Sequence, residues 1–112
     1  MSCLFCQIVS GEIPTEILYE TETILVFRDR FPKAPVHMLV IPKAHVTSIM
    51  DLTEGSPVAE NCFSAIRSVA IKAGLSENGF RVITNVGKDG GQTVNHLHFH
   101  VMGGRSFSWP PG

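Results

Sequence analysis

The sequence predicts an α+β fold, with a mainly antiparallel five-stranded sheet, one long helix and a short N-terminal helix. Apolar residues recur at three- and four-residue steps across residues 57–73, as on one face of a helix. Residues 96–102 alternate between polar and apolar side chains, the period of a strand. At 112 residues the chain is long enough for one compact core and too short for two, so we predict a single domain over residues 1–112.

The remaining elements follow from shorter signals along the chain. Gly11 and Gly74 mark the ends of the two helices, predicted over residues 3–9 and 57–73. Stretches rich in apolar and β-branched residues predict the strands, which we place at residues 17–20, 23–28, 36–41, 80–86 and 96–102. We expect a Pro-punctuated loop at residues 29–35, one or two helical turns at residues 45–52 and an irregular tail at residues 103–112.

Charge and composition exclude several classes of protein. The net charge is −1, with nine basic and ten acidic residues and no basic cluster, so neither a nucleic acid nor a membrane is an expected partner. No apolar run approaches the ~20 residues of a membrane-spanning helix, and residues 1–15 do not resemble a secretory signal. An odd number of cysteines, three, suits a reducing compartment. We therefore expect a cytoplasmic protein that is small enough to enter a nucleus as well.

A row of histidines is the strongest functional signal. His96, His98 and His100 alternate with apolar residues, so in a strand their rings share one face at a spacing of about 7 Å. Imidazole is largely neutral near pH 7, so one ring can attack phosphorus while a neighbour supplies a proton. A phospho-histidine intermediate divides one difficult displacement into two easier steps. A poly-histidine metal site is the alternative reading of the same row.

Two further motifs are ambiguous by themselves. Gly90 and Gly91 precede polar residues and leave backbone N–H groups room to approach an anion, although a Gly pair more often marks a plain turn. Cys3 and Cys6 form a C-x-x-C pair that fits a zinc half-site, a redox pair or two metal-free thiols. The redox reading is weak because no thioredoxin-like strand precedes the pair. Cys62 falls on the apolar face of the long helix and is predicted to be a core thiol.

Residues 90–102 together resemble the signature of the histidine triad (HIT) hydrolases. The resemblance extends through residues 27–29 and 34–43 to the ending Trp109-Pro110-Pro111-Gly112. The short length and this ending resemble the Hint branch, the purine nucleoside phosphoramidases. The resemblance implies a HIT-like fold and a homodimer in which the C-terminal Trp109 reaches the partner's site; a Trp109 folded back on its own subunit is the alternative.

The resemblance also implies roles for individual residues. His98 would be the nucleophile that forms a nucleotidyl-histidine, with His100 and His37 beside it binding phosphate oxygens and assisting proton transfer. No cofactor would be needed for catalysis. Asp29 would accept hydrogen bonds from the ribose hydroxyls. The other nucleotide-binding positions fall into a phosphate group, Asn85, Gly91, Gln92 and Thr93 with His98 and His100, and an apolar purine slot, Leu4, Phe5, Ile8, Ile13 and Phe27 with Trp109.

Some positions in this set carry alternatives. Ile8 and Ile13 serve equally well as ordinary core residues. Arg30 departs from the family, which usually places an aliphatic residue against the base at that position, so base preference is left open. A zinc-bearing subset of HIT proteins has a similar Cys and His arrangement, which implies a structural Cys₂His₂ zinc site. Its ligands here would be Cys3, Cys6, His45 and His96.

The sequence therefore predicts a nucleotide hydrolase that cleaves purine nucleoside phosphoramidates or related nucleoside monophosphate conjugates and releases AMP or GMP. A dinucleoside polyphosphate hydrolase is the rival within the same class, and it would need room for a second nucleotide. From another class, the chain would be a catalytically weak nucleotide- or zinc-binding regulatory module. A DNA-repair deadenylase is disfavoured because the chain lacks a basic surface.

Overall fold

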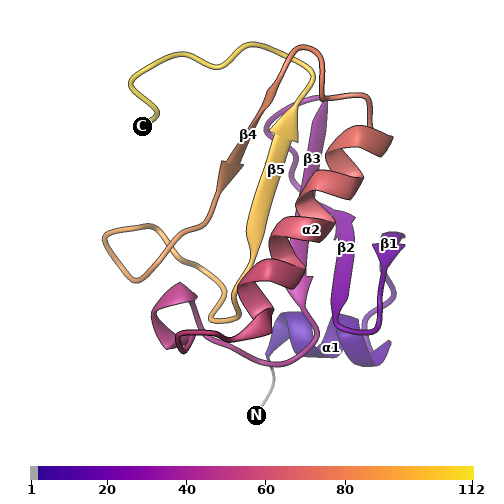
Figure 1. The fold of residues 1–112 in the computed structure, drawn as a ribbon, viewed down its shortest axis with the longest axis vertical. Coiled ribbons are helices and arrows are strands. Elements are labelled where there is room, and N and C mark those ends of the chain that lie inside the picture. Colours follow the sequence, from indigo (N-terminus) through magenta and orange to yellow (C-terminus); the bar gives the residue numbers. More distant parts are fainter. Residues whose placement is uncertain (1–2) are drawn as a thin grey trace.

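The computed structural model describes residues 3–112 and confirms the predicted fold class (Figure 1). Five strands form one antiparallel sheet in the order β1-β2-β3-β5-β4. In chain order the elements are α1 (Leu4–Ser10), β1 (Ile17–Glu20), β2 (Ile24–Arg28), β3 (Val36–Pro42), the 3₁₀ helix η1 (Ile49–Asp51), α2 (Pro57–Lys72), β4 (Phe80–Ile83) and β5 (Phe99–Gly103). Within this described range no helix combines the length and the apolar character that crossing a membrane requires.

Helix α2 begins and ends with strong local signals. The Ser56 hydroxyl accepts the N–H of Val58 and Pro57 occupies the first turn, both typical of a helix start. Gly74 follows the last turn with φ +77°, a conformation that glycine adopts without strain. The helix lies across one face of the central strands, as Figure 1 shows, and its buried face consists of Cys62, Ala65, Ile66, Val69 and Ala70.

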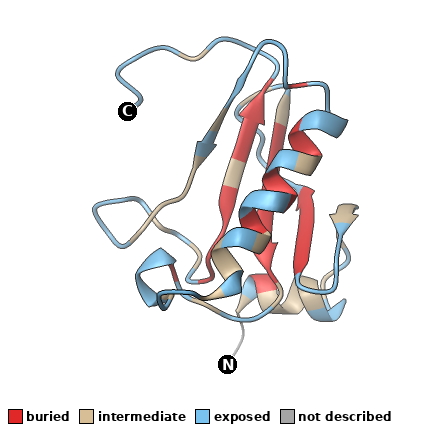
Figure 2. Ribbon diagram, viewed as in Figure 1, coloured by how far each residue is buried: buried red, intermediate tan, exposed pale blue. Residues whose placement is uncertain are grey.

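Both faces of the central sheet are covered. The face toward α2 carries the larger core, to which β2, β3 and β5 contribute Ile24, Val26, Met38, Val40, Phe99 and Val101. The opposite face carries a smaller cluster, in which Phe5 of α1 joins Leu25, Phe27, Leu39 and Ile41. This double burial explains why residues 24–27 are apolar without alternation (Figure 2).

The predicted strands at residues 80–86 and 96–102 are too long. The ladder of β5 begins at Phe99, which pairs with Val40, and β4 ends at Ile83, which pairs with His100. Before Phe99 the backbone has partners outside the sheet: the Leu97 N–H donates to Val46 O at 2.6 Å. His96 and His98 therefore precede the strand, although the predicted in-and-out alternation continues through them.

The sheet edge at β4 is only partly covered. Phe80 and Val82 are 39% and 37% exposed, because α2 lies over the central strands and leaves this edge open (Figure 2). After β5 the chain has no helix or strand, which confirms the predicted irregular tail over residues 104–112, whereas Gly103 is the last residue of β5. At the β4 edge of the sheet, apolar side chains and unpaired strand backbone therefore face solvent.

Candidate active site and metal centre

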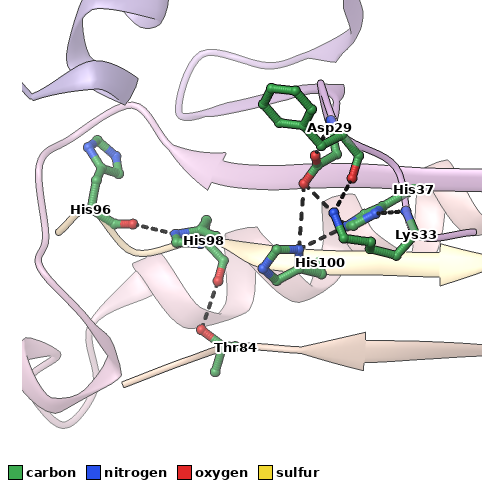
Figure 3. Close-up of polar contacts among 8 residues, drawn as sticks. Asp29, Lys33, His37, Thr84, His96, His98 and His100 are labelled. Carbon is green, nitrogen blue, oxygen red and sulfur yellow. Dashed lines mark hydrogen bonds and ion pairs between the residues drawn. The ribbon is translucent and has the colours of Figure 1, made fainter. Parts of the chain in front are cut away.

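The predicted catalytic histidines meet on the sheet face opposite α2. His37 lies on β3 and His100 on the neighbouring β5, where it pairs with Leu39 of the smaller core cluster. The two rings are 5.1 Å apart, and the ring of His98 is 5.2 Å from that of His100 (Figure 3). The structure thus brings His37, His98 and His100 together, with His98 just before the strand.

The tautomer of His98 is fixed by a backbone carbonyl. Its Nδ1 lies 2.7 Å from the oxygen of His96 (Figure 3). A carbonyl oxygen only accepts hydrogen bonds, so Nδ1 carries the proton and Nε2 retains its lone pair. The ring is 5% exposed and meets Phe5 edge-on at 5.1 Å, which holds it in one orientation. In its neutral form, His98 therefore presents an oriented Nε2 that carries a lone pair.

His37 and His100 form a directed hydrogen bond. The backbone N–H of Lys33 donates to Nδ1 of His37 at 3.0 Å, so the ring proton of neutral His37 is on Nε2. That Nε2 lies 2.9 Å from Nδ1 of His100, which accepts the bond and leaves the proton of His100 on its own Nε2 (Figure 3). Each neutral ring thus has one defined donor.

The pKa values keep this pair neutral. Burial lowers the pKa of His100 to about 4, and the nearby His98 and His37 add to the shift. Burial also lowers the pKa of His37, an effect that Asp29 opposes and the charge of Lys33 assists. In both cases loss of hydration of the charged form is the largest cause. Near pH 7 the two rings therefore act as hydrogen-bonding groups rather than as fixed cations.

Asp29 lies beside this pair. Its Oδ2 is 3.3 Å from Nε2 of His37 and 3.9 Å from Nδ1 of His100, while Oδ1 accepts the N–H of Phe31 at 2.8 Å. Such a group of one carboxylate and two imidazoles is a potential metal site. The Lys33 N–H argues against it, because it leaves the proton of His37 on the nitrogen that a metal would need. Asp29 is the ribose acceptor predicted from the sequence, and its carboxylate faces the histidines in the structure.

The predicted phosphate loop is closely packed. A Cβ on Gly90 would lie 2.3 Å from Val86 O, and Gly91 has φ +76°, so glycine is required at both positions. The Asn85 side chain donates to Gly90 O at 2.6 Å. Gln92 accepts from Gly87 N and donates to the carbonyls of Thr47 and Val94, so its amide stabilises the loop, a role that the sequence did not predict. Thr93 is exposed.

The predicted purine slot is only partly built from buried residues. Phe5 and Phe27 are buried and meet edge-on at 5.5 Å next to His98. Ile8 packs against this cluster and Ile13 is half-buried, whereas Leu4 and Arg30 are exposed. Trp109 is 81% exposed, so most of its indole faces solvent instead of its own subunit. The predicted slot thus has a buried apolar floor, formed by Phe5 and Phe27, while its outer residues Leu4 and Trp109 are exposed to solvent.

The four predicted zinc ligands converge at the start of α1. Nδ1 of His96 lies 3.3 Å from Cys3 Sγ and 3.6 Å from Cys6 Sγ, and Cys6 Sγ lies 3.4 Å from Nδ1 of His45. All four ligand atoms lie within 4.8 Å of one another. A zinc ion with ordinary Zn–S and Zn–N bonds separates its ligand atoms by about 3.5 Å. The cluster is therefore compatible with zinc.

Backbone contacts prepare this cluster for a metal. Nε2 of His96 donates to Pro42 O at 2.8 Å, so its Nδ1 has a lone pair and faces the two sulfurs. Cys3 also caps α1, because its Sγ accepts the N–H of Cys6 at 3.4 Å. Burial raises the pKa of the Cys6 thiol in the absence of a metal, and a bound cation reverses that shift. Cys62 lies apart from the cluster and is buried in the core, as predicted.

Comparison with known proteins agrees with this geometry. Residues 10–107 match the HIT domain. The chain belongs to the HIT family. It is 44% identical to an uncharacterized HIT-like protein of Synechococcus elongatus over 97% of this chain and 96% of that protein. Its HIT fold therefore spans almost the whole of this relative.

Solved HIT structures extend the likeness to three dimensions. A HIT family hydrolase from Legionella pneumophila is 46% identical, with a TM-score of 0.96 over 99% of this chain and 100% of that chain. A histidine triad nucleotide-binding protein from Candida albicans is 31% identical, with a TM-score of 0.85 over 97% of this chain and 83% of that chain. The arrangement of strands and helices is thus shared with HIT proteins from bacteria and from a fungus.

Proposed function

We propose that this HIT protein is a nucleotide hydrolase that cleaves purine nucleoside phosphoramidates or related nucleoside monophosphate conjugates and releases AMP or GMP. The observation that carries the proposal is the bond from Nδ1 of His98 to His96 O, which leaves Nε2 free to attack beside a neutral His100. Structural neighbours named HIT family hydrolase and histidine triad nucleotide-binding protein support the same class.

The first chemical step is displacement at the α-phosphorus. The lone pair on Nε2 of His98 forms a bond to phosphorus as the bond to the leaving nitrogen or oxygen breaks. The ring then carries a positive charge, which the bond from its Nδ1–H to His96 O stabilises. The Nε2–H of His100, fixed by the bond from His37, is positioned as a donor to a phosphate oxygen or to the leaving group.

In the second step a water molecule attacks phosphorus and breaks the bond to Nε2 of His98. The nucleoside monophosphate leaves and His98 returns to its neutral form, while the proton that the water releases to solvent balances the proton that the leaving group took up from solvent in the first step. Phe5 and Phe27 form the apolar floor for the base, and Asp29 is the acceptor that we assign to the ribose. Gly90 and Gly91 allow the loop backbone to approach the phosphate.

We assign a structural role to zinc. The donor set of two thiols and two imidazoles fits a closed tetrahedral site, with no position left for substrate. When bound, the ion supplies cross-linking and no step of hydrolysis. Cys3 and Cys6 would then hold α1, with Phe5, against the start of the histidine segment. The base slot and the nucleophile would share one anchor.

We propose a homodimer formed through the open edge of the sheet. Phe63 and Ile71 of α2 are 56% and 52% exposed on the side where Phe63 meets Phe99 of β5. Phe80 and Val82 continue this apolar surface onto β4. A second copy would cover it and pair the edge strands, and Trp109 of one protomer would close the base slot of the other. We place this dimer in the cytoplasm, with the nucleus also accessible.

A turnover panel tests the function. Adenosine and guanosine phosphoramidates are compared with diadenosine polyphosphates, and rapidly quenched enzyme is examined by mass spectrometry. We expect a steep preference for phosphoramidates and a nucleotide adduct on His98. A preference for the polyphosphates would establish the rival hydrolase, and no turnover of any of these substrates would favour a regulatory binding module. Light scattering in the same buffer measures the expected dimer mass.

A further inference from the structure

Arg105 connects the segment after β5 to the loop that orients His37. Its Nη2 donates to Lys33 O at 2.9 Å, across 72 residues of sequence. The N–H of the same Lys33 donates to Nδ1 of His37 at 3.0 Å. Residue 33 is therefore held at both of its backbone groups, by a guanidinium on one side and by the imidazole on the other.

The chain packs closely where these two segments meet. A Cβ on Gly104 would lie 2.9 Å from Cβ of Pro35, and Gly104 has φ +90°, so this contact requires glycine. The Arg105 guanidinium also lies over the Phe107 ring, 4.2 Å from its centroid. The guanidinium is thus oriented by the tail before it reaches Lys33.

Arg81 provides a natural comparison on the same ring. Its guanidinium lies 5.1 Å from the centroid of Phe107, and its Nη2 donates to Ser108 O at 2.7 Å. Arg81 therefore shares the aromatic contact and a bond to a backbone carbonyl with Arg105. Arg105 likewise donates to the tail, through Nη1 to Ser106 O at 2.9 Å, but it also donates to Lys33 O, which Arg81 does not.

The Lys33 N–H determines what His37 offers to His100. With that donor on Nδ1, the proton of His37 is on Nε2 and points to Nδ1 of His100. If residue 33 moves away, Nδ1 of His37 is free to take the proton, and Nε2 of His37 then carries a lone pair that only accepts a hydrogen bond. The bond that leaves His100 with its own Nε2–H would be lost.

We propose that Arg105 is a positioning residue for the hydrolysis proposed above, and that it holds Lys33 so that His37 keeps its proton on Nε2. The inference rests on that proposed function for its effect on rate. Its effect on the tautomer concerns the free protein alone. Arg105 touches neither His37 nor the reacting atoms, and it acts through one peptide segment.

Kinetics provide the first test, with three variants of the full chain. Arg105→Ala is expected to lower kcat about three- to tenfold, the usual range for one ordinary hydrogen bond, with KM within about twofold. Arg105→Lys, which keeps a charged donor, should recover most of the rate. Arg81→Ala removes the matched guanidinium and should stay near wild type. An equal loss in Arg81→Ala and Arg105→Ala would overturn the inference in favour of a general effect of the tail.

The imidazole tautomer provides the second test, and it needs no substrate. Two-bond ¹H–¹⁵N spectra of the histidine rings, with His37 assigned from a His37→Gln variant, should show the Nε2–H form in wild type and in Arg81→Ala. Arg105→Ala should show a mixture that includes Nδ1–H. An unchanged His37 in Arg105→Ala would overturn the inference even if the enzyme is active. If no substrate is turned over, the proposed function fails while this test of Arg105 still stands.

Discussion

The segment from His96 to His100 has a different group of histidines at each end. The two groups use the imidazole in opposite ways, one as a lone-pair donor and the other as an N–H donor. In the zinc-compatible cluster, His96 donates its Nε2–H to Pro42 O, and its lone pair faces Cys3 and Cys6. In the catalytic group, His37 accepts the Lys33 N–H, and its proton is directed to His100. A backbone carbonyl leaves the first ring with a lone pair toward the sulfurs, and a backbone amide leaves the second ring with its proton toward His100.

Residue type alone therefore does not separate a candidate metal site from a proposed catalytic one. Both groups contain two imidazoles together with thiols or a carboxylate. In each group all the ligand atoms lie within 4.8 Å of one another. Only the first has lone pairs that converge. His98 stands between the two groups, and its bond to His96 O links the geometry of one to the other.

Removing the proposed nucleophile, His98, is expected to have the largest effect on the proposed catalytic group. His98→Ala should lower kcat by about 10⁴-fold or more, because the covalent step needs Nε2 of this ring. Binding of AMP, measured by calorimetry, should change little, since several other groups hold the phosphate. Substantial hydrolysis in His98→Ala, or an adduct on a different histidine, would mean that the two groups have been assigned the wrong roles.

Removing the thiols should affect stability first. The double variant Cys3→Ser/Cys6→Ser should lose about one zinc per chain and lower Tm by roughly 10 °C, because metal binding contributes to folding. Activity should fall only as α1 loosens. Elemental analysis of protein made without a metal-binding tag measures the ion, with Cys62→Ala as a control that keeps it. Metal-free wild-type protein of normal stability would show that Cys3 and Cys6 are ordinary thiols and not zinc ligands.

Acid should destabilise the folded protein over a defined pH range, because His100 of the proposed catalytic group is buried as a neutral ring. The pKa of His100 is about 4 when folded and near 6.5 when exposed, so below pH 6.5 the unfolded chain binds the extra proton. The free energy of unfolding should have its full value above pH 6.5 and should fall by up to about 3 kcal/mol as the pH approaches 4. Denaturant titrations at several pH values should show a shallower decline for His100→Asn than for wild type. Equal slopes would exclude His100 as the source.

The smallest expected effect concerns Asp29. Asp29→Ala should raise KM for ribonucleotides roughly tenfold and lower kcat less, because ribose contacts stabilise ground and transition states alike. The same change should have little effect on KM for 2′,3′-dideoxy substrates, which lack both hydroxyls. A fall in kcat with KM unchanged would show instead that the carboxylate acts on the His37 and His100 pair that it faces.

Local patterns were sufficient to predict the fold class and its elements, but not the order in which the strands pair. The apolar period of α2, the β-branched strands and the glycines at helix ends all act over a few residues, so the sequence displays them directly. The strand ends were harder, because Leu97 bonds to Val46 O instead of continuing the ladder. A contact between residues that are far apart in sequence leaves no periodic signal.

The candidate site was likewise predicted in one part and missed in another. The sequence indicated its side chains, through the histidine row, the C-x-x-C pair and the family resemblance. It did not indicate the backbone groups that set each tautomer, which belong to Pro42, Lys33 and His96. Every residue has an N–H or a carbonyl, so residue type does not show which of them will face an imidazole. The role of Gln92 within its own loop was missed for a similar reason.

The strand order β1-β2-β3-β5-β4 also governs when the site can form. β1, β2 and β3 are sequence neighbours and can pair through short connections, whereas β5 must join β3 after a long intervening segment. His37 meets His100 across 63 residues, and Cys3 meets His96 across 93. Closing such long loops costs entropy and slows folding. A chain stalled at the first three strands would have no catalytic pair and no complete metal cluster, so the first appearance of turnover during refolding would report the docking of β5.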